Sequence, residues 1–252
     1  MAAPYVDVAE LALYSFFGFF LALVFYLRRE DRREGYPLED DISGRVDSDN
    51  SALLFDDAKT FLLPFDRGTV TTPTGERDPQ PDNVTYNGPR YAGTPFEPTG
   101  NPLSSGVGPG AYAQRKDWPD LDYHGNPRVV PMRVAADILV ADVREDPRGM
   151  PVTGCDGIIA GTVADLWIDR ADHVVRYFEV ALSGGGTALL PQTMSVVHRR
   201  HVSTDSITAA QFAGSPGVRT PDQITFLEEE KVQAYFGAGY LWATPGRSEP
   251  YL

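Results

Sequence analysis

The residue types best suited to moving a proton lie together in one short segment, Asp122-Tyr123-His124-Gly125-Asn126. A carboxylate and an imidazole can share protons, and the same pair can ligate a transition-metal ion. An extended chain would point Asp122, His124 and Asn126 to the same side. The pattern also fits an ordinary solvated loop, so the residues alone leave both interpretations open.

Glu179 is a second candidate, because it lies in a segment, 174–182, that alternates like a β-strand. Alternation places Phe178 and Val180 on an apolar face, and it places Glu179 on the opposite face with Tyr177. One interpretation is an exposed strand carboxylate. The other is a carboxylate at a protein interface, where partial loss of water would raise its pKa and allow proton exchange near neutral pH.

No other motif predicts an active site. The segment His198-Arg199-Arg200-His201 fits either a basic or metal-binding patch or an ordinary exposed segment without a function. The glycine-rich segment 106–110 lacks the Lys-Ser/Thr of a phosphate loop. Neither G-x-S-x-G nor HExxH occurs, and Cys155 is the only cysteine. We therefore expect no independent catalytic activity, which argues against a membrane-bound hydrolase.

Residues 11–27 form an unbroken run of uncharged, mostly large apolar side chains, and a charge cluster at 28–34 follows at once. As a helix this run covers about 25 Å, so the residues before it must reach into the interface of a hydrocarbon core of about 30 Å. A cleaved signal peptide is the alternative, but Asp7 and Glu10 precede the run and no small-x-small site follows it. The arginines after the run predict a cytoplasmic C-terminal side and place segment 1–10 outside, on the opposite side of the membrane.

The charge balance excludes some classes of partner. A net charge of -13, from 35 acidic and 22 basic residues, argues against nucleic-acid binding and against a domain that lies flat on anionic lipid. Such a surface serves solubility, or it collects protons for a buried acceptor. A single cysteine cannot form a disulfide within the chain, which suits a reducing cytoplasm.

Beyond the apolar run we expect a juxtamembrane linker, 28–58, and then a region, 59–133, with little apolar periodicity. That region begins with a predicted hairpin, in which strands 59–63 and 69–73 are joined by PFDRG. From Pro73 to Pro127 prolines and glycines dominate, yet aromatic residues recur, as a disordered linker would not show. We expect an extended strap that is ordered only against partner subunits.

The remaining residues, 134–252, are expected to form a β-rich domain with one C-terminal helix. Several short strands at this spacing predict a small barrel or a tightly curled sheet. The helix should run from Glu228 to about Leu241, because acids favour the first turn and apolar residues recur at helical spacing. The expected strands are 134–143, 161–169, 174–182, 187–190 and 223–227.

A series of short motifs, in order over essentially the whole chain, resembles the H subunit of purple-bacterial photosynthetic reaction centres. They include Arg33-Glu34-Gly35-Tyr36-Pro37-Leu38-Glu39, Lys59-Thr60-Phe61-Leu62-Leu63-Pro64, Gly106-Val107-Gly108-Pro109, Asp165-Leu166-Trp167-Ile168-Asp169 and Leu227-Glu228-Glu229. The resemblance implies that the cytoplasmic domain is a PRC-type small β-barrel. The expected fold is thus a single N-terminal transmembrane helix, the Pro/Gly-rich strap, this barrel and a C-terminal helix.

The resemblance also implies a function. Such a subunit binds no pigment, caps the cytoplasmic face of the L and M subunits, and conducts protons to the secondary quinone. Bacteriochlorophyll, bacteriopheophytin, ubiquinone, non-haem iron and carotenoid are expected in the partner subunits, with antenna polypeptides and membrane lipids around them. The location would be the bacterial inner, intracytoplasmic membrane. The alternative is a membrane-tethered PRC-barrel adaptor for a soluble protein, which would need neither the motif after the helix nor the strap.

For the candidate residues, the resemblance implies that Asp122 and His124 form a proton entry point. Relatives have a second histidine at the position of Asn126 and bind zinc or cadmium there, so tight metal binding by Asp122 and His124 is in doubt. It further implies that Glu179 lies under the quinone site within the proton-transfer network.

Overall fold

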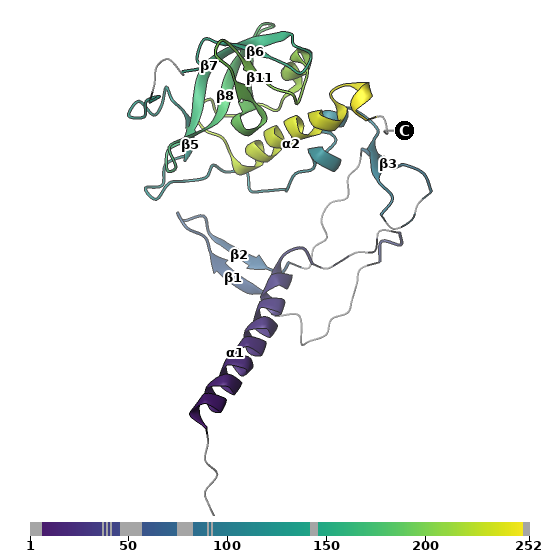
Figure 1. The fold of residues 1–252 in the computed structure, drawn as a ribbon, viewed down its shortest axis with the longest axis vertical. Coiled ribbons are helices and arrows are strands. Elements are labelled where there is room, and N and C mark those ends of the chain that lie inside the picture. Colours follow the sequence, from purple (N-terminus) through teal and green to yellow (C-terminus); the bar gives the residue numbers. More distant parts are fainter. Residues whose placement is uncertain are drawn as a thin grey trace, which may run out of the picture. The chain divides into compact units, whose positions relative to one another are not determined.

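The computed structural model (Figure 1) describes residues 7–36, 38, 40, 42–45, 57–74, 83–89, 91, 93–141 and 146–248. The chain divides into two compact units, Met1–Gln80 with Pro89–Thr94, and Pro81–Gly88 with Pro95–Leu252. The first unit holds the apolar helix and the first hairpin. The second unit holds the β-rich domain and all candidate site residues.

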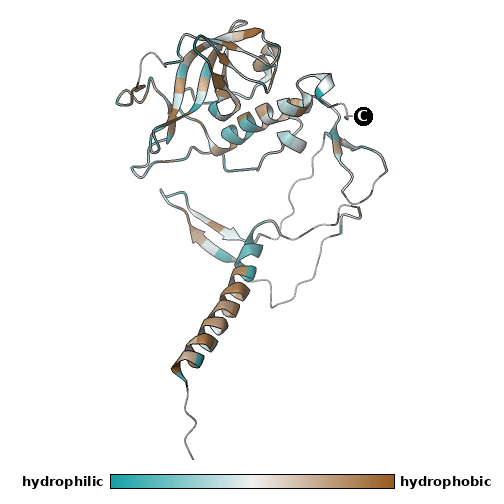
Figure 2. Ribbon diagram, viewed as in Figure 1, coloured by the Kyte–Doolittle hydropathy of each residue, from teal (hydrophilic) through white to brown (hydrophobic). Residues whose placement is uncertain are grey.

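Helix α1, Val8–Glu30, is the one helix in the described part of the chain that is long and apolar enough to cross a membrane. Asp7 caps it by accepting a hydrogen bond from the Ala9 backbone N–H at 2.9 Å, and Arg28 and Arg29 suit the negative end of its dipole. Its 23 residues cover about 35 Å. Figure 2 shows that most of its residues are apolar, and none of them is buried. The predicted helix is therefore confirmed, with one further turn at each end.

A short hairpin is attached to the end of α1. Strands β1, Lys59–Leu62, and β2, Thr69–Thr72, pair antiparallel as predicted, with Lys59 opposite Thr72. The 3₁₀ turn Asp31–Arg33 places Arg33 at their base, where its guanidinium donates to the carbonyls of Asp57 at 2.9 Å and Thr72 at 3.3 Å. The Thr72 hydroxyl donates back to the Arg33 carbonyl at 2.5 Å. This reciprocal pairing fixes the hairpin to the helix end.

The second unit is built on a strongly curled sheet in the order β10-β11-β6-β7-β8-β9, with β5 paired to β7. All neighbours are antiparallel except β6 and β11, which run parallel. The long central strands form as predicted, and buried side chains from both of their faces, with those of the C-terminal helix, belong to one core. The strands are β5 Val129–Pro131, β6 Pro151–Thr153, β7 Ile159–Asp169, β8 Val174–Leu182, β9 Thr187–Pro191, β10 Val196–Val197 and β11 Val202–Ser203.

Two predicted strands are wrong. The described residues of 134–143 form turns, because the carbonyl of Pro131 accepts from the amides of Val134 and Ala135 and bends the chain away from β7. The segment 223–227 is no strand either. The Thr225 hydroxyl accepts from the Glu228 amide at 3.1 Å, and the Glu228 carboxylate accepts from the Thr225 amide at 2.9 Å. This capping box starts a helix instead.

Helix α2, Phe226–Trp242, covers one face of the sheet and buries Val232, Tyr235 and Phe236. Gly239 lies where the helix approaches the backbone before it. A Cβ at this position would lie 2.5 Å from the Ser206 carbonyl oxygen, so the packing requires glycine. The predicted helix is confirmed, and it begins two residues earlier than expected.

Part of the strap packs on its own chain. Strands β3, Val84–Tyr86, and β4, Phe96–Pro98, form a small hairpin, and two 3₁₀ turns that follow contact α2. Leu103 in the first of these turns is only 4% exposed and belongs to the core. For this part of the strap, α2 supplies apolar surface within the same chain. The 3₁₀ turns of this unit are Pro102–Ser104, Gly108–Gly110, Gln192–Met194, Ala209–Gly214 and Pro245–Arg247.

Candidate proton-transfer site

The segment with Asp122 and His124 is a tight hairpin loop. Its base is closed by hydrogen bonds from the Arg128 amide to the Asp120 carbonyl at 2.9 Å and from the Asp122 amide to the Asn126 carbonyl at 2.8 Å. Gly125 turns the chain at φ 85°, a conformation that side chains disfavour. The extended conformation expected from the alternating pattern is therefore wrong.

Asp122 holds the loop together. Its Oδ1 accepts hydrogen bonds from the backbone amides of Asn126 and His124, both at 2.9 Å. These hydrogen bonds, that from Asn126 foremost, lower the pKa of Asp122. The carboxylate is thus ionised at neutral pH and lies two residues from an exposed imidazole, whose ring centroid is 3.7 Å from that of Tyr123.

The loop does not fit a tightly bound metal ion. Tight sites in proteins use three or four side-chain ligands, and Asn126 supplies no imidazole. Within the described ranges, no three histidine, cysteine or acidic side chains are grouped closely enough to hold a metal ion. Asp122 also already accepts two backbone hydrogen bonds. Asp122 and His124 therefore make a poor resident metal site.

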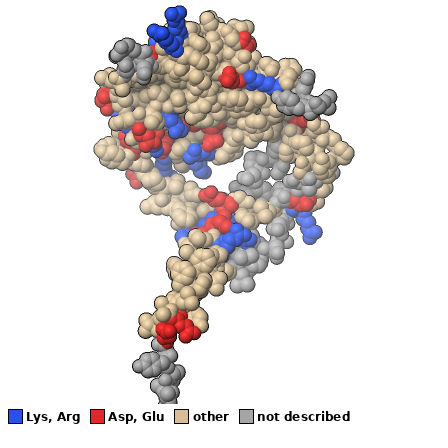
Figure 3. All heavy atoms as spheres, viewed as in Figure 1, with Lys and Arg blue, Asp and Glu red and all other residues tan. Residues whose placement is uncertain are grey.

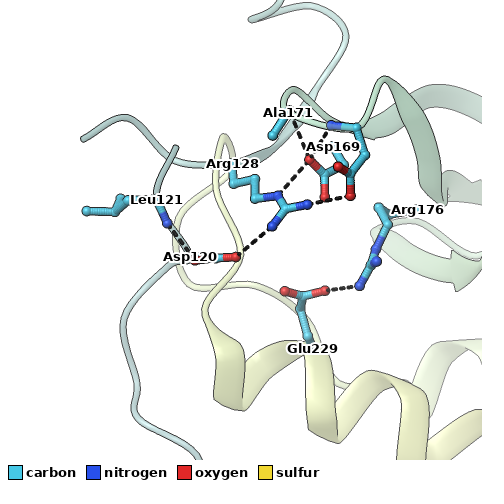
Figure 4. Close-up of polar contacts among 8 residues, drawn as sticks. Asp120, Leu121, Arg128, Asp169, Ala171, Arg176 and Glu229 are labelled. Carbon is cyan, nitrogen blue, oxygen red and sulfur yellow. Dashed lines mark hydrogen bonds and ion pairs between the residues drawn. The ribbon is translucent and has the colours of Figure 1, made fainter. Parts of the chain in front are cut away.

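A charged cluster adjoins the base of the loop (Figure 4). The guanidinium of Arg128 donates from Nε to Asp169 at 2.8 Å and from Nη2 to Asp172, and its Nη1 lies 3.5 Å from a carboxylate oxygen of Asp120. Asp169 also accepts from the backbone amides of Ala171 and Asp172 at 3.0 and 3.1 Å. One arginine thus joins the loop to the turn between β7 and β8.

Asp169 is 2% exposed, yet it is held as a carboxylate. Burial alone would raise its pKa, but the hydrogen bonds from Arg128 and from the amides of Asp172 and Ala171 outweigh this effect and lower the pKa. The pKa of Arg128 is raised in turn, chiefly by its hydrogen bond to Asp169. The pair is therefore charged at any physiological pH.

The cluster lines a cavity of about 410 Å³. On its far side Arg176 lies 3.4 Å from Glu229 of α2, which also accepts a 2.8 Å hydrogen bond from the Tyr177 hydroxyl. Figure 3 shows basic and acidic side chains mixed on the side of this unit that carries β5. A space of this size with charged walls can hold several water molecules.

Glu179 lies in a different cluster. Its Oε2 accepts from Trp167 Nε1 at 2.7 Å and from Arg133 Nη1 at 2.8 Å, and the same Arg133 nitrogen donates to Asp165 at 3.1 Å. The Glu179 side chain is only 15% exposed. It lines a second cavity, of about 380 Å³, with Arg133, Arg148 and Asp165 among the other walls. The interpretation as an exposed strand carboxylate is therefore wrong even without a partner.

The two clusters lie along one strand. In the pairing of β7 with β8, Asp165 lies opposite Glu179 and Trp167 lies opposite Tyr177. Alternation carries Asp165, Trp167 and Asp169 to the same face of β7, which makes a row of polar side chains between the clusters. No contact in the described part of the chain joins Glu179 directly to Asp122 or His124.

Sequence analysis missed the cluster around Arg128. Arg128 and Asp169 are 41 positions apart, and only the pairing of β5 with β7 brings them together. The spacing of Asp165, Trp167 and Asp169 was the available signal, since acids at alternate positions of a strand share one face.

Comparison with known families agrees with the fold. Residues 141–214 match the PRC-barrel domain, which confirms the expected barrel and contains β6 to β11. Residues 1–134 match the family described as photosynthetic reaction centre, H-chain N-terminal region. This second match takes in α1, the hairpin, the strap and the loop with Asp122 and His124. Because it covers more than half of the 252 residues, the chain belongs to the H-chain family of photosynthetic reaction centres.

Proposed function

We propose that this chain caps the cytoplasmic side of the reaction-centre L and M subunits and conducts protons to the secondary quinone during light-driven electron transport. The observation that carries the proton role is the position of the Asp122 and His124 loop, whose base joins the Arg128 cluster. The proposed route for protons starts at the exposed imidazole of His124 and the carboxylate of Asp122. It continues through acidic side chains that are partly buried.

Helix α1 anchors the chain in the intracytoplasmic membrane with its N-terminus in the periplasm. Arg28 and Arg29 at the end of α1 support this orientation, since positive charge is retained on the cytoplasmic side. Antenna polypeptides and lipids would surround the helix. The match to residues 1–134 favours this assignment over a barrel adaptor, because it includes the anchor and the strap.

The partner subunits would hold bacteriochlorophyll, bacteriopheophytin, ubiquinone, non-haem iron and carotenoid, and they supply the electron-transfer chemistry. This chain contributes only proton delivery and support. His124 and Asp122 collect protons, because imidazole is the side chain that most readily changes charge near neutral pH.

From the loop, Asp120 and Asp172 continue the route toward the cavity beside Asp169. The row on β7 then leads past Trp167 to Asp165 and Glu179. Arg128 joins Asp120, Asp169 and Asp172, and Arg133 joins Asp165 and Glu179. Water would bridge the remaining gap between Asp169 and Asp165, since no contact among the described residues does so. Glu179, opposite Asp165 on β8, is the last carboxylate of the route.

The test is proton uptake by assembled complexes after a pair of flashes. Replacing Asp122→Asn and His124→Gln together removes both titrating groups while keeping side chains of similar size. We expect uptake at the second electron transfer to slow by about 10-fold or more, with the first charge separation unchanged. Added imidazole should restore part of the rate. Unchanged uptake in the double variant would place the entry point elsewhere.

A further inference from the structure

We propose that Arg128 is a positioning residue, which fixes the loop with Asp122 and His124 on the barrel so that protons collected there enter the route. The inference rests on the proposed function, but the placement of the loop can be measured independently. Arg128 itself would carry no proton. Its task is to keep the donor groups of the loop at a constant distance from Asp172 and Asp169.

The backbone of Arg128 lies at the joint between the loop and the sheet. Its amide donates to the Asp120 carbonyl at 2.9 Å and closes the base of the loop. Its carbonyl accepts from the Arg170 amide at 2.9 Å, which extends the pairing of β5 with β7. The residue therefore belongs to the loop on one side and to the barrel on the other.

The side chain makes the same connection a second time. Nη1 faces Asp120 in the loop, whereas Nε and Nη2 donate to Asp169 and Asp172 at the β7–β8 turn (Figure 4). All three guanidinium nitrogens are used, and the side chain is 29% exposed. A planar fork can hold three carboxylates in fixed directions, whereas a lysine ammonium is a single point charge.

The geometry of the loop matters because proton transfer depends steeply on distance. A displacement of about 1 Å in a reacting group can cost about 100-fold in rate. Without Arg128, the side-chain links to Asp120, Asp169 and Asp172 are lost, and all three carboxylates lose their only arginine partner in the described part of the chain. The loop would then depend on backbone pairing alone.

Arg219 offers a matched control. It also ties the strap to the domain through two acids, with Nη2 2.7 Å from Asp117 and Nε 3.4 Å from Glu228. Asp117 precedes the loop in the sequence, and neither contact of Arg219 involves residues 120–128. Arg219→Met thus removes an arginine bridge of the same kind without loosening the loop.

The experiment measures the loop position in the full-length chain. Spin labels at Tyr123→Cys, on the exposed loop, and Ser183→Cys, on an exposed turn of the barrel, would report one distance after Cys155→Ser removes the native thiol. We expect Arg128→Met to broaden the distance distribution and Arg219→Met to leave it narrow. In assembled complexes Arg128→Met should slow proton uptake by about 10- to 100-fold. Added imidazole should restore that rate, which it would not do if the variant had only a folding defect.

Arg128→Lys serves where Arg128→Met fails to assemble, because one ammonium can still pair with the buried Asp169. It should also broaden the distribution, since a single ammonium cannot reach all three acids. A narrow distribution in whichever arginine variant assembles would overturn the positioning role. The two proposals can also fail separately. If the Arg128 variants show a broad distance distribution but the Asp122→Asn, His124→Gln double variant takes up protons at the wild-type rate, the positioning role stands and the proton entry point is refuted.

Discussion

Trp167 donates its indole N–H to Oε2 of Glu179 at 2.7 Å, across the pairing of β7 with β8. The two residues thus form a fixed pair whose donor is 1% exposed and whose acceptor also faces a cavity. A carboxylate held through one oxygen keeps its position while the other oxygen is available for a proton. This arrangement makes the role of Glu179 testable by small substitutions.

The first prediction concerns Glu179→Gln. The amide keeps the shape of the side chain and can accept from Trp167, but it cannot ionise. We expect normal assembly and a slower proton-coupled second electron transfer, with Glu179→Asp milder. Flash-induced kinetics in assembled complexes provide the measurement. Wild-type second-electron rates on both sides of neutral pH would show that Glu179 has only a structural role.

The second prediction concerns Arg133→Met. This substitution removes the cation from Glu179 and from the buried Asp165, to which Arg133 donates at 2.8 and 3.1 Å. We expect the free energy of unfolding to fall by about 1 to 3 kcal/mol, as when a buried polar group loses its partner. Arg148→Met is the control, because Arg148 lines the same cavity but pairs with Asp146. Equal losses in both variants would contradict the prediction.

The third prediction is a pH dependence of stability that originates at Asp169. Its pKa is lowered in the folded chain, so its contribution is present above the unfolded pKa of about 3.9 and is lost as pH falls through the folded pKa. Asp169→Asn should remove this part of the acid destabilisation and should lower stability at neutral pH. Denaturant unfolding at several pH values tests this, with the exposed Asp137→Asn as control. If the free energy of unfolding of Asp169→Asn falls with decreasing pH as steeply as that of the unaltered chain, the prediction is wrong.

The fourth prediction concerns the close packing of α2. A Cβ at position 239 would meet the Ser206 carbonyl oxygen at 2.5 Å and its hydroxyl at 2.8 Å. Gly239→Ala should therefore lower the free energy of unfolding by about 1 to 3 kcal/mol, despite alanine's higher helix propensity. Gly246→Ala has no atom within 4 Å of the new Cβ and should be neutral. Thermal unfolding of both variants decides between these expectations.

The fifth prediction concerns the strap. The amides of Gly110 and Ala111 donate within the chain, to the carbonyls of Val107 and Gly108, beside the buried Leu103. Hydrogen exchange on the full chain without partners should therefore be slow at these amides. Leu103→Ala should accelerate it and cost about 2 to 5 kcal/mol. Fast exchange at both amides in the unaltered chain would show that the strap needs its partners after all.

The sequence predicts those elements whose pattern repeats over several residues. Helix α1, the strands β7, β8 and β9, and α2 all have such a pattern. Strands β10 and β11 have two residues each, and β6 pairs in parallel with β11 some 50 positions away. Their existence depends on pairing within the sheet, for β6 and β11 with a strand far away in the sequence, and not on local preference, so no local pattern reveals them.

The candidate site was predictable in part for the same reason. Asp122 and His124 stand in one segment and can be recognised from residue type. The conformation of this segment cannot be predicted from residue type. The turn at Gly125 and the hydrogen bonds to Asp122 replace the extended chain that alternating side chains would suggest. Arg128 and Asp169 become neighbours only through strand register, which a single sequence does not display.

The parallel pairing of β6 with β11, and the burial of Phe236 and Val232 from α2, have a consequence for the order of synthesis. Helix α1 precedes this domain in the chain, so it is synthesised before the domain. Strand β6 lacks its parallel partner until residue 203 has been made, and part of the core stays uncovered until α2 is complete. We therefore expect the domain to complete its fold only after α2 has been made, and its apolar core side chains to stay exposed until then.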